Sequence, residues 1–217
     1  MLYFEVIILI ITSIVKQKRN DERYNIYIDN NFTFSADIED IIKYDIKEGV
    51  KLDQNSLDFL IENCEGTKAY NYCLKLLGRR DYTETELRRK LEQKYYSNKT
   101  IEKVLEKLKI YDIINDDRYI KKYINNSQRF KKHGKKKILF NLGNKGIPGE
   151  MLQMINIDEN TEYENAYNLA LKKLNLVKEK PDRIERICRY LISKGYEYGL
   201  VKRVLNEILS NSESDDI

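Results

Sequence analysis

The sequence is poor in the residues that most often bind metals or carry out catalysis, because it has one histidine and three cysteines. Cys64, Cys73 and Cys188 form no Cys-x-x-Cys pair, and together with the histidine they match no standard spacing of a zinc site. We therefore interpret them as structural thiols of a protein in a reducing cytoplasm. His133 lies in a run of lysines, which is typical of a solvated surface residue rather than a base or a metal ligand.

Motifs for nucleotide binding and for membrane insertion are also missing. No P-loop occurs, and the glycine cluster GNKGIPG at 143–149 lacks the preceding strand of a dinucleotide site. The apolar run at the N-terminus is too short to cross a membrane and contains Glu5. No basic segment precedes this run and no small-residue cleavage site follows it, so a signal peptide is not indicated. We expect a cytoplasmic, non-enzymatic protein that uses no cofactor.

Adjacent carboxylates occur at Asp116 and Asp117, where they could hold a metal ion. They come directly before a predicted helix, so helix capping and complementarity to the helix dipole explain the pair more simply. We predict no catalytic, cofactor-binding or metal-binding residues.

The sequence does contain an internal repeat. Residues 89–108 and 189–208 are identical at six of twenty positions without a gap, and a fainter copy covers 140–156. The copies align Leu91, Leu142 and Leu191, and they lie about fifty residues apart, which is typical of a tandem array of helical units. We expect these three leucines to occupy equivalent buried positions.

Helical periodicity begins after Gly66 and predicts nine short helices in three units. Thr83 and Glu86 have the spacing of a capping box at the start of one helix. Each unit then has a break between its second and third helices. Gly146 and Gly195 suit the left-handed position that ends a helix, and Tyr95 in place of glycine predicts a different turn in the first unit.

Strand-like segments precede these helices. Residues 11–17 are one candidate, and 24–34 contain two β-rich runs around Asp29-Asn30-Asn31, which suits a hairpin turn. Two predicted helices at 36–44 and 53–63 would cover the sheet. The predicted fold is mainly all-α: an elongated, curved, monomeric rod of three three-helix repeats with a small N-terminal α+β module, a short β-meander plus helices. The predicted boundaries are 1–65 for this module, 66–113, 114–157 and 158–210 for the repeats, and 211–217 for a flexible acidic tail.

Positive charge is concentrated in the middle of the chain. Ten lysines and arginines and no acidic residue lie between Arg118 and Lys145, whereas the whole chain carries a net charge of +4. A merely solvated face would intersperse acidic residues, as the segment 83–94 does. The pattern therefore favours a polyanionic or acidic partner. A second basic set surrounds the first turn between helices and consists of Arg79, Arg80, Arg88, Arg89 and Lys90.

Taken in order, several segments resemble the RecX family of regulatory proteins. They are RRDYTETELRRKL at 79–91, NDDRYI at 115–120, RFKKHGKKKILFNLGNKGI at 129–147 and ISKGYEYGLVKRVL at 192–205. The resemblance covers about 66–209, and the strand-like segments resemble the N-terminal extension of some members. It implies a modulator of the RecA recombinase that lies in the groove of the RecA–DNA filament and restrains ATP hydrolysis, strand exchange and coprotease activity. A rod of repeated units suits a long partner groove.

Two functions therefore remain open from the sequence. The first is a regulator that binds the RecA filament on single-stranded DNA, and the alternative is a helical protein that binds DNA or RNA directly, without an obligate protein partner. Steep weakening of nucleic-acid binding by salt, without an effect on RecA, would favour the alternative. The predicted partner-binding residues are basic side chains of the middle repeat and of the first turn between helices: Lys121, Lys122, Arg129, Lys131, Lys132, Lys135, Lys136, Lys137, Arg79, Arg80, Arg88 and Arg89.

Overall fold

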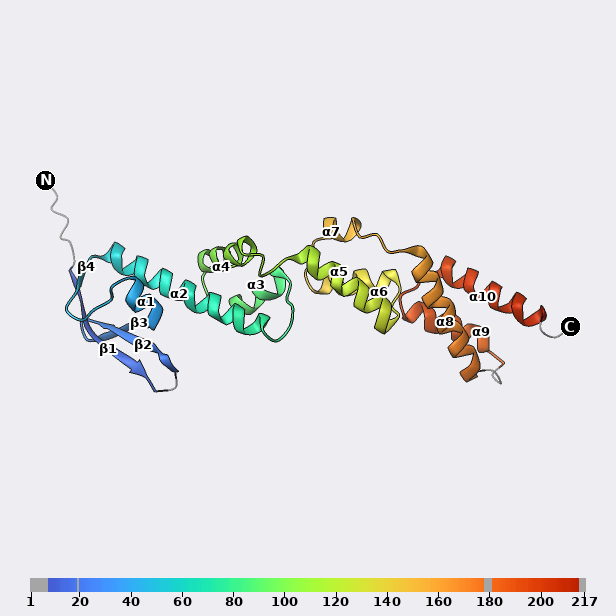
Figure 1. The fold of residues 1–217 in the computed structure, drawn as a ribbon, viewed down its shortest axis with the longest axis horizontal. Coiled ribbons are helices and arrows are strands. Elements are labelled where there is room, and N and C mark those ends of the chain that lie inside the picture. The colour runs from blue at the N-terminus through green and yellow to red at the C-terminus, as the bar shows by residue number, and fades with distance from the viewer. Residues whose placement is uncertain (1–7, 19, 178–180, 215–217) are drawn as a thin grey trace. The chain divides into compact units, whose positions relative to one another are not determined.

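The structure is a computed structural model that describes residues 8–18, 20–177 and 181–214. It comprises two compact units, Met1–Ile114 and Asn115–Ile217, which we describe separately. Figure 1 shows a small sheet and helices in the first unit and helices alone in the described part of the second. Among the described residues, no helix combines the length and the hydropathy that crossing a membrane requires.

A four-stranded antiparallel sheet opens the first unit. Its strands lie in the order β3-β2-β1-β4, with the bounds β1 Leu9–Gln17, β2 Asn20–Ile28, β3 Asn31–Asp37 and β4 Lys51–Leu52. Asp29 and Asn30 take φ values of 49° and 66°, so the predicted hairpin turn is confirmed. The predicted meander is present, and β4 adds a short strand on the free edge of β1.

Two helices accompany this sheet: α1 (Ile38–Lys43) and α2 (Gln54–Leu77). The N-terminal half of α2 supplies Leu57, Leu60 and Cys64 to the core that the strands form. Gly66 lies inside α2, which continues through it without a break, so no linker separates the N-terminal module from the first repeat at this position. One long helix serves both (Figure 1).

The first repeat consists of the second half of α2 with α3 (Glu84–Glu92) and α4 (Asn98–Ile110). Thr83 and Glu86 form the predicted capping box at the start of α3. The buried core unites the three helices through Cys73 from α2, Leu91 from α3 and Leu105 from α4.

The second repeat begins the second unit and departs most from the predicted pattern. Its elements are α5 (Asp116–Asn126), a π-helical turn η1 (Ser127–Lys131), α6 (Lys135–Asn144) and α7 (Gly149–Gln153). Asn115 caps α5, whereas Asp116 and Asp117 lie in its first turn, so they complement the dipole but do not cap. The third helix of this repeat is short because it ends at Gln153, and Leu152 in it is half-buried.

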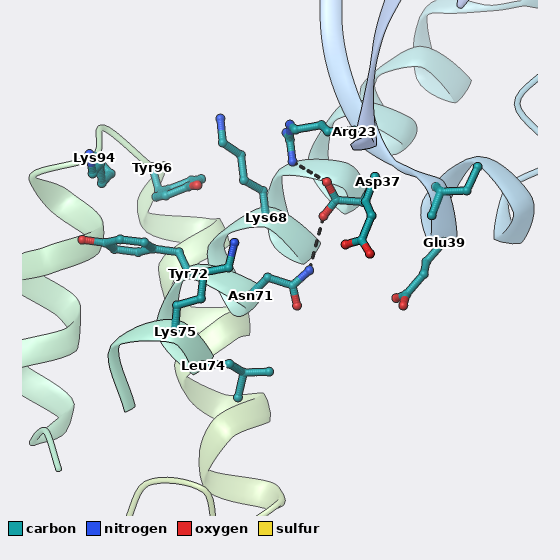
Figure 2. A pocket seen from close by; sticks show the side chains of 12 residues that line it. Arg23, Asp37, Glu39, Lys68, Asn71, Tyr72, Leu74, Lys75, Lys94 and Tyr96 are labelled. Atoms are coloured by element: carbon teal, nitrogen blue, oxygen red, sulfur yellow. Dashed lines mark hydrogen bonds and ion pairs between the residues drawn. The ribbon is translucent and has the colours of Figure 1, made fainter. Parts of the chain in front are cut away.

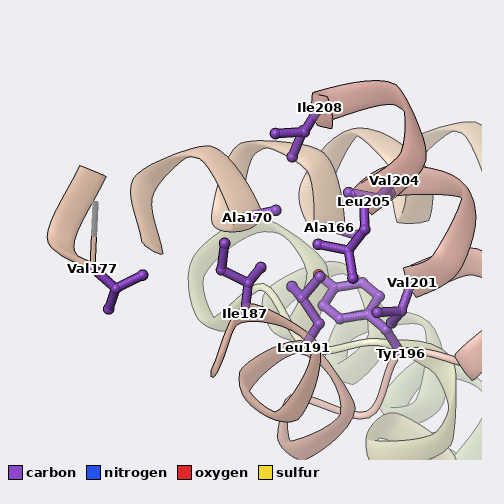
Figure 3. Packing of buried hydrophobic residues seen from close by; sticks show 10 residues of the cluster. All are labelled: Ala166, Ala170, Val177, Ile187, Leu191, Tyr196, Val201, Val204, Leu205 and Ile208. Atoms are coloured by element: carbon purple, nitrogen blue, oxygen red, sulfur yellow. The ribbon is translucent and has the colours of Figure 1, made fainter. Parts of the chain in front are cut away.

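The third repeat consists of α8 (Glu159–Val177), α9 (Arg183–Ser193) and α10 (Tyr198–Ser214). Figure 3 shows the buried ring of Tyr196 beside Leu191 and Val201 in its core. Leu91, Leu142 and Leu191 are each completely buried, which confirms the repeat alignment. The helix α10 includes residues 211–214, so most of the predicted acidic tail is helical, and 215–217 lie outside the described residues.

The two cysteines in α2 are buried: Cys64 in the core of the N-terminal module and Cys73 in the core of the first repeat. Burial raises the pKa of the Cys64 thiol to about 12 and that of the Cys73 thiol to about 11. Both thiols therefore stay protonated near neutral pH and are poor nucleophiles. Cys188 is half-buried, and none of the three forms a disulfide.

The corner between the second and third helices is the same in all three repeats. Gly146 and Gly195 have φ values of 83° and 92°, as predicted, and Tyr95 takes the same left-handed conformation with φ of 62°. The expectation of a different turn at Tyr95 was therefore wrong. The shared geometry of the repeat imposes a conformation that is unfavourable for a residue with a side chain.

Replacing Tyr95 with glycine should stabilise the first unit slightly. The left-handed conformation costs a non-glycine residue about 1–2 kcal/mol, whereas glycine adds about 0.5–1 kcal/mol of backbone entropy to folding. The Tyr95 side chain is 96% exposed, so its removal costs little packing. We expect a gain of about 0.5 kcal/mol in the free energy of unfolding, measured with urea. Tyr95→Ala, which keeps the strain, should show no gain.

An acidic side chain is buried where α1 meets α2. Asp40 is 2% exposed and accepts a hydrogen bond from the Thr67 hydroxyl at 2.8 Å. Its other carboxylate oxygen, Oδ2, has no hydrogen-bond partner among the residues that the structure describes. Burial raises the pKa of Asp40 above its ordinary value, although the hydrogen bond from Thr67 opposes the shift. The ionised carboxylate is therefore a destabilising group.

Asp40→Asn should raise the stability of the first unit near pH 7 by about 1 kcal/mol, because it removes a buried charge. A raised pKa in the folded state means that the contribution of Asp40 is fully favourable below the unfolded value of 3.8 and is lost as the pH rises through the folded value. The advantage of the variant should therefore vanish near pH 3. Denaturant unfolding of both proteins at the two pH values measures this, and an equal difference at both would contradict it.

Candidate functional site

Eight predicted site residues lie on consecutive elements of the second repeat, and we call them the basic surface: Lys121, Lys122, Arg129, Lys131, Lys132, Lys135, Lys136 and Lys137. α5 carries the first two, and both are exposed. The turn η1 carries Arg129 and Lys131, which are also exposed. The π-helical turn is rare in proteins and is often found at functional sites. It presents two cations between helices α5 and α6.

The remaining lysines surround the start of α6, and three of the four are less exposed than those on α5 and η1. Lys136 is exposed, whereas Lys132, Lys135 and Lys137 are half-buried. Lys132 takes the left-handed conformation with φ of 51° and ends η1. The Nζ atom of Lys137 donates to the carbonyl of Ser193 at 3.0 Å. Part of the predicted surface thus belongs to a contact with the third repeat.

The third repeat satisfies the first turn of α6. Amides at the start of a helix have no partner within the helix. Here they donate across the contact: Gly134 to the Lys194 carbonyl (3.0 Å), Lys135 to Oε1 of Glu162 (2.7 Å) and Lys136 to the Gly195 carbonyl (3.1 Å). Glu162 is 7% exposed, and burial raises its pKa above the ordinary value, against the opposing effect of Lys135. The buried carboxylate of Glu162 from α8 thus caps the N-terminus of α6.

The turn η1 is held in the same way. The Tyr196 hydroxyl donates to the carbonyl of Lys132 at 2.9 Å, and the Asn165 side-chain amide donates to the carbonyl of Gln128 at 3.3 Å. Both donors belong to the third repeat and are buried. The backbone that carries Arg129 and Lys131 is therefore fixed at both ends by residues from outside the second repeat.

Aromatic rings alternate with cations along α5. Tyr119 and Tyr123 are stacked one helical turn apart, with ring centroids 6.2 Å apart and an angle of 14° between their planes. Lys145 lies over the ring of Tyr119 and Lys131 over that of Tyr123, each at 5.7 Å from the centroid. Such cation–π contacts contribute about 0.5–1 kcal/mol each at exposed sites.

Acidic neighbours distinguish the two predicted basic sets. In the described part of the chain, Lys121, Arg129, Lys131 and Lys136 have no ion pair with a carboxylate, so their charge is uncompensated. In the first repeat, by contrast, two of the predicted arginines are ion-paired: Arg80 with Glu86 at 3.2 Å, and Arg88 with both Glu84 and Glu102. Arg80 also lies 3.6 Å over the ring of Tyr82. Arg79 and Arg89 of this set are exposed.

His133 follows the left-handed Lys132 and is half-buried, so its interpretation as a solvated surface residue was wrong. Its Nδ1 atom has no hydrogen-bond partner among the described residues. Burial, with the charges of Lys137, Lys194 and Lys131, lowers the pKa of His133 below its ordinary value. The imidazole is therefore neutral near pH 7 and adds no charge to the basic surface.

A hollow of about 780 Å³ lies in the first unit between the sheet and the first repeat (Figure 2). Asp37 in its wall links β2 to α2, because it accepts hydrogen bonds from Arg23 at 2.7 Å and from Asn71 at 3.3 Å. Its other charged lining residues have both signs and are Glu22, Glu39, Lys68, Lys75 and Lys94. The hollow thus lacks the uniform charge of the basic surface and selects no class of ligand by sign.

Sequence reasoning missed the residues that hold and complete the basic surface. Glu162, Asn165 and Tyr196 lie far from it in the sequence, and no local pattern connects them with α6. Lys145 carried a usable signal, because it aligns with Lys94 and Lys194 in the other repeats. In each repeat this lysine lies over a tyrosine ring, at 5.9, 5.7 and 5.7 Å.

Models of protein families match three parts of the chain. They are the regulatory protein RecX N-terminal domain at residues 9–53, the first three-helix domain of RecX at 69–108 and the third three-helix domain of RecX at 160–205. The matched segments together cover more than half of the sequence, in the order that the resemblance predicted.

Relatives match over nearly their whole length. The regulatory protein RecX of Clostridioides difficile (strain 630) is 35% identical over 210 residues, which are 95% of this chain and 99% of the relative. That of Clostridium perfringens (strain 13 / Type A) is 35% identical over 207 residues, 93% and 97% of the two chains.

Two crystal structures have a similar fold. A structure of regulatory protein RecX has a TM-score of 0.68 at 24% identity and covers 91% of this chain and 99% of its own. A structure of RecX from Lactobacillus salivarius has a TM-score of 0.61 at 26% identity and covers 65% and 95%. Sequence and fold agree with the resemblance in the repeats, and the chain belongs to the RecX family of regulatory proteins.

Proposed function

We propose that this protein binds the RecA filament on single-stranded DNA through the basic surface and inhibits its ATP hydrolysis, strand exchange and coprotease activity. The protein would act as a non-enzymatic monomer in the cytoplasm. The observation that carries the proposal is the uncompensated charge of Lys121 on α5 and of Arg129 and Lys131 on η1, a turn that the third repeat holds in place. Membership of a family named for regulation supports it.

The physical form of the surface suits a partner with regularly spaced negative charge. Lysine and arginine bind phosphates and carboxylates through charge-assisted hydrogen bonds. Cations on solvated side chains also accelerate encounter with a polyanion, so the association rate should fall as salt rises. Because η1 is anchored at both ends, little backbone entropy is lost when it binds.

The arginines around the first turn are weaker candidates for the same contact. Arg80 and Arg88 are ion-paired with glutamates of their own repeat, and binding a partner through them would require those pairs to break. Arg79, which is exposed, remains a candidate for a secondary contact. We therefore rank the second repeat above the first as the binding site.

The aromatic rings between the cations favour a second candidate, direct binding of single-stranded nucleic acid. Stacked tyrosines with lysines over them, as at Tyr119 and Tyr123, are compatible with base contacts. The two candidates differ in their dependence on RecA.

Titration of this protein into RecA that is hydrolysing ATP on single-stranded DNA tests the proposal. We expect inhibition at protein concentrations below that of the DNA nucleotides, and greater inhibition at low salt. Order of addition separates the candidates, because a protein that merely occupies free DNA would inhibit when added before RecA but not after filaments have formed. Unchanged ATP hydrolysis in both orders would overturn the proposed function.

A further inference from the structure

An exposed aromatic ring lies near the end of η1. Phe130 is 71% exposed although a phenylalanine of this size normally gains free energy from burial. The turn that presents it is a π-helical insertion ending in the left-handed Lys132, and both features are costly relative to a regular helix end. Folding alone gives no reason to expose this ring on such a turn.

The turn is rigid because of contacts at both of its ends. The His133 amide donates to the Ser127 carbonyl at 3.1 Å and closes the turn from within. Asn165 and Tyr196 of the third repeat bind the carbonyls of Gln128 and Lys132, as described above. The position of Phe130 on the backbone is thus set before any partner arrives.

Two cations flank Phe130 in the sequence. The guanidinium of Arg129 lies 5.3 Å from the centre of the Phe130 ring, and Lys131 extends over the ring of Tyr123. A single strand of nucleic acid alternates phosphates with bases, and proteins bind it with cations interleaved with aromatic faces. An aromatic anchor for a protein would instead be expected among apolar neighbours.

The same repeat contains a second exposed phenylalanine, and this one has apolar neighbours. Phe140 is 67% exposed on α6 and lines a shallow groove with Leu139 and Leu152. Phe130 and Phe140 are thus similarly exposed rings in one repeat, one beside a cation and one beside leucine side chains. They provide a matched pair for experiment.

We propose that Phe130 stacks on a base of single-stranded DNA, while Arg129 and Lys131 contact the phosphates on either side. This inference rests on the proposed function. Within the RecA filament, it assigns the nucleic acid, rather than a RecA protomer, as the partner of η1. It involves no covalent step.

The chain has no tryptophan, so Phe130→Trp introduces a single indole fluorophore at the proposed contact, which can be excited selectively over the tyrosines. Stacking on a base quenches indole fluorescence. We expect an oligothymidylate of about 15 nucleotides to quench the reporter, and an abasic oligomer of the same length, which keeps every phosphate, to leave it bright. Phe140→Trp should not respond to either oligomer.

Affinity provides the second measurement, made by fluorescence anisotropy of labelled oligomers without RecA. Phe130→Ala should weaken binding of the oligothymidylate about tenfold and leave binding of the abasic oligomer unchanged. Phe130→Leu, which keeps the apolar volume but has no aromatic face, should behave like the alanine variant. Phe140→Ala should bind as the wild type does.

Several results would overturn the inference: an unquenched reporter at 130, equal quenching by the abasic oligomer, or wild-type affinity in Phe130→Leu. Their consequence for the proposed function is separate. Inhibition of RecA by a protein with an unquenched reporter would leave the proposed function standing and assign η1 to a RecA protomer. Quenching of the reporter in a protein that has no effect on RecA would support the contact of Phe130 with DNA and overturn the proposed function.

Discussion

Replacing Lys121, Arg129 and Lys131 together with glutamate should weaken association with the RecA–DNA filament at least about 100-fold near 0.1 M salt. The three side chains are exposed and have no carboxylate partner in the described part of the chain. Reversal therefore removes three attractive charges and adds three repulsive ones without breaking an ion pair. Because each lost phosphate contact lowers the salt dependence, the dependence of binding on salt should also become shallower by about three in slope.

A second triple variant in the same unit controls for net charge. Lys172, Arg183 and Lys202 are exposed on α8, α9 and α10, outside the basic surface. Their replacement with glutamate changes the net charge by the same amount and should leave binding within about threefold of the wild type. Neither variant should shift the free energy of unfolding by more than about 0.5 kcal/mol per substitution. Equal loss of binding in both variants would mean that overall charge, and no particular surface, drives association.

Gly195→Ala should destabilise the second unit by about 2–5 kcal/mol and separate α6 from the corner of the third repeat. Gly195 has a left-handed φ of 92°, which costs an alanine about 1 kcal/mol or more. A Cβ atom there would lie 2.3 Å from Cβ of Lys137 and 2.5 Å from its backbone nitrogen, so the backbones must move apart. Thermal and urea unfolding measure the loss, and binding of the filament should weaken with it.

Two further glycines separate the two causes. Gly49 has φ of 84°, and a Cβ atom added there would have no other atom within 4 Å in the described part of the chain, so Gly49→Ala should show the conformational cost alone, about 1 kcal/mol. Gly134 has a φ of −75°, but a Cβ atom there would lie 2.5 Å from the Gly195 carbonyl oxygen. Gly134→Ala should therefore show the steric cost alone, about 1–3 kcal/mol. A wild-type stability for Gly134→Ala would mean that the two repeats are not in close contact.

Much of the fold was accessible from the sequence because it depends on local rules. The turn at Asp29-Asn30 and the capping box at Thr83 are properties of a few adjacent residues. The buried Leu91, Leu142 and Leu191 were accessible because three copies of one unit repeat the same core position. The failures occurred where a residue type conflicts with the shared geometry, as at Tyr95, where the repeat imposes a left-handed backbone on a tyrosine.

The candidate site, too, could be predicted from the sequence only in part. Its charge was visible in the sequence, since ten cations without one acid between Arg118 and Lys145 require no structure to be recognised. Which cations are free was not visible, because ion pairing depends on neighbours from other helices. Arg88 pairs with Glu102 of α4, fourteen positions away, whereas the exposed Lys131 has no carboxylate partner among the described residues.

The sequence by itself determined the three helical units, their equivalent core leucines, the concentration of positive charge and the family, since each follows from residue type and spacing along the chain. Only the tertiary structure decided how that charge is displayed. Glu162 and Tyr196 reach the start of α6 and the end of η1 from a different repeat, and these contacts select the backbone of the π-helical turn. The physical reason is that hydrogen bonds between distant segments depend on how helices pack, and packing joins residues that no spacing along the sequence connects.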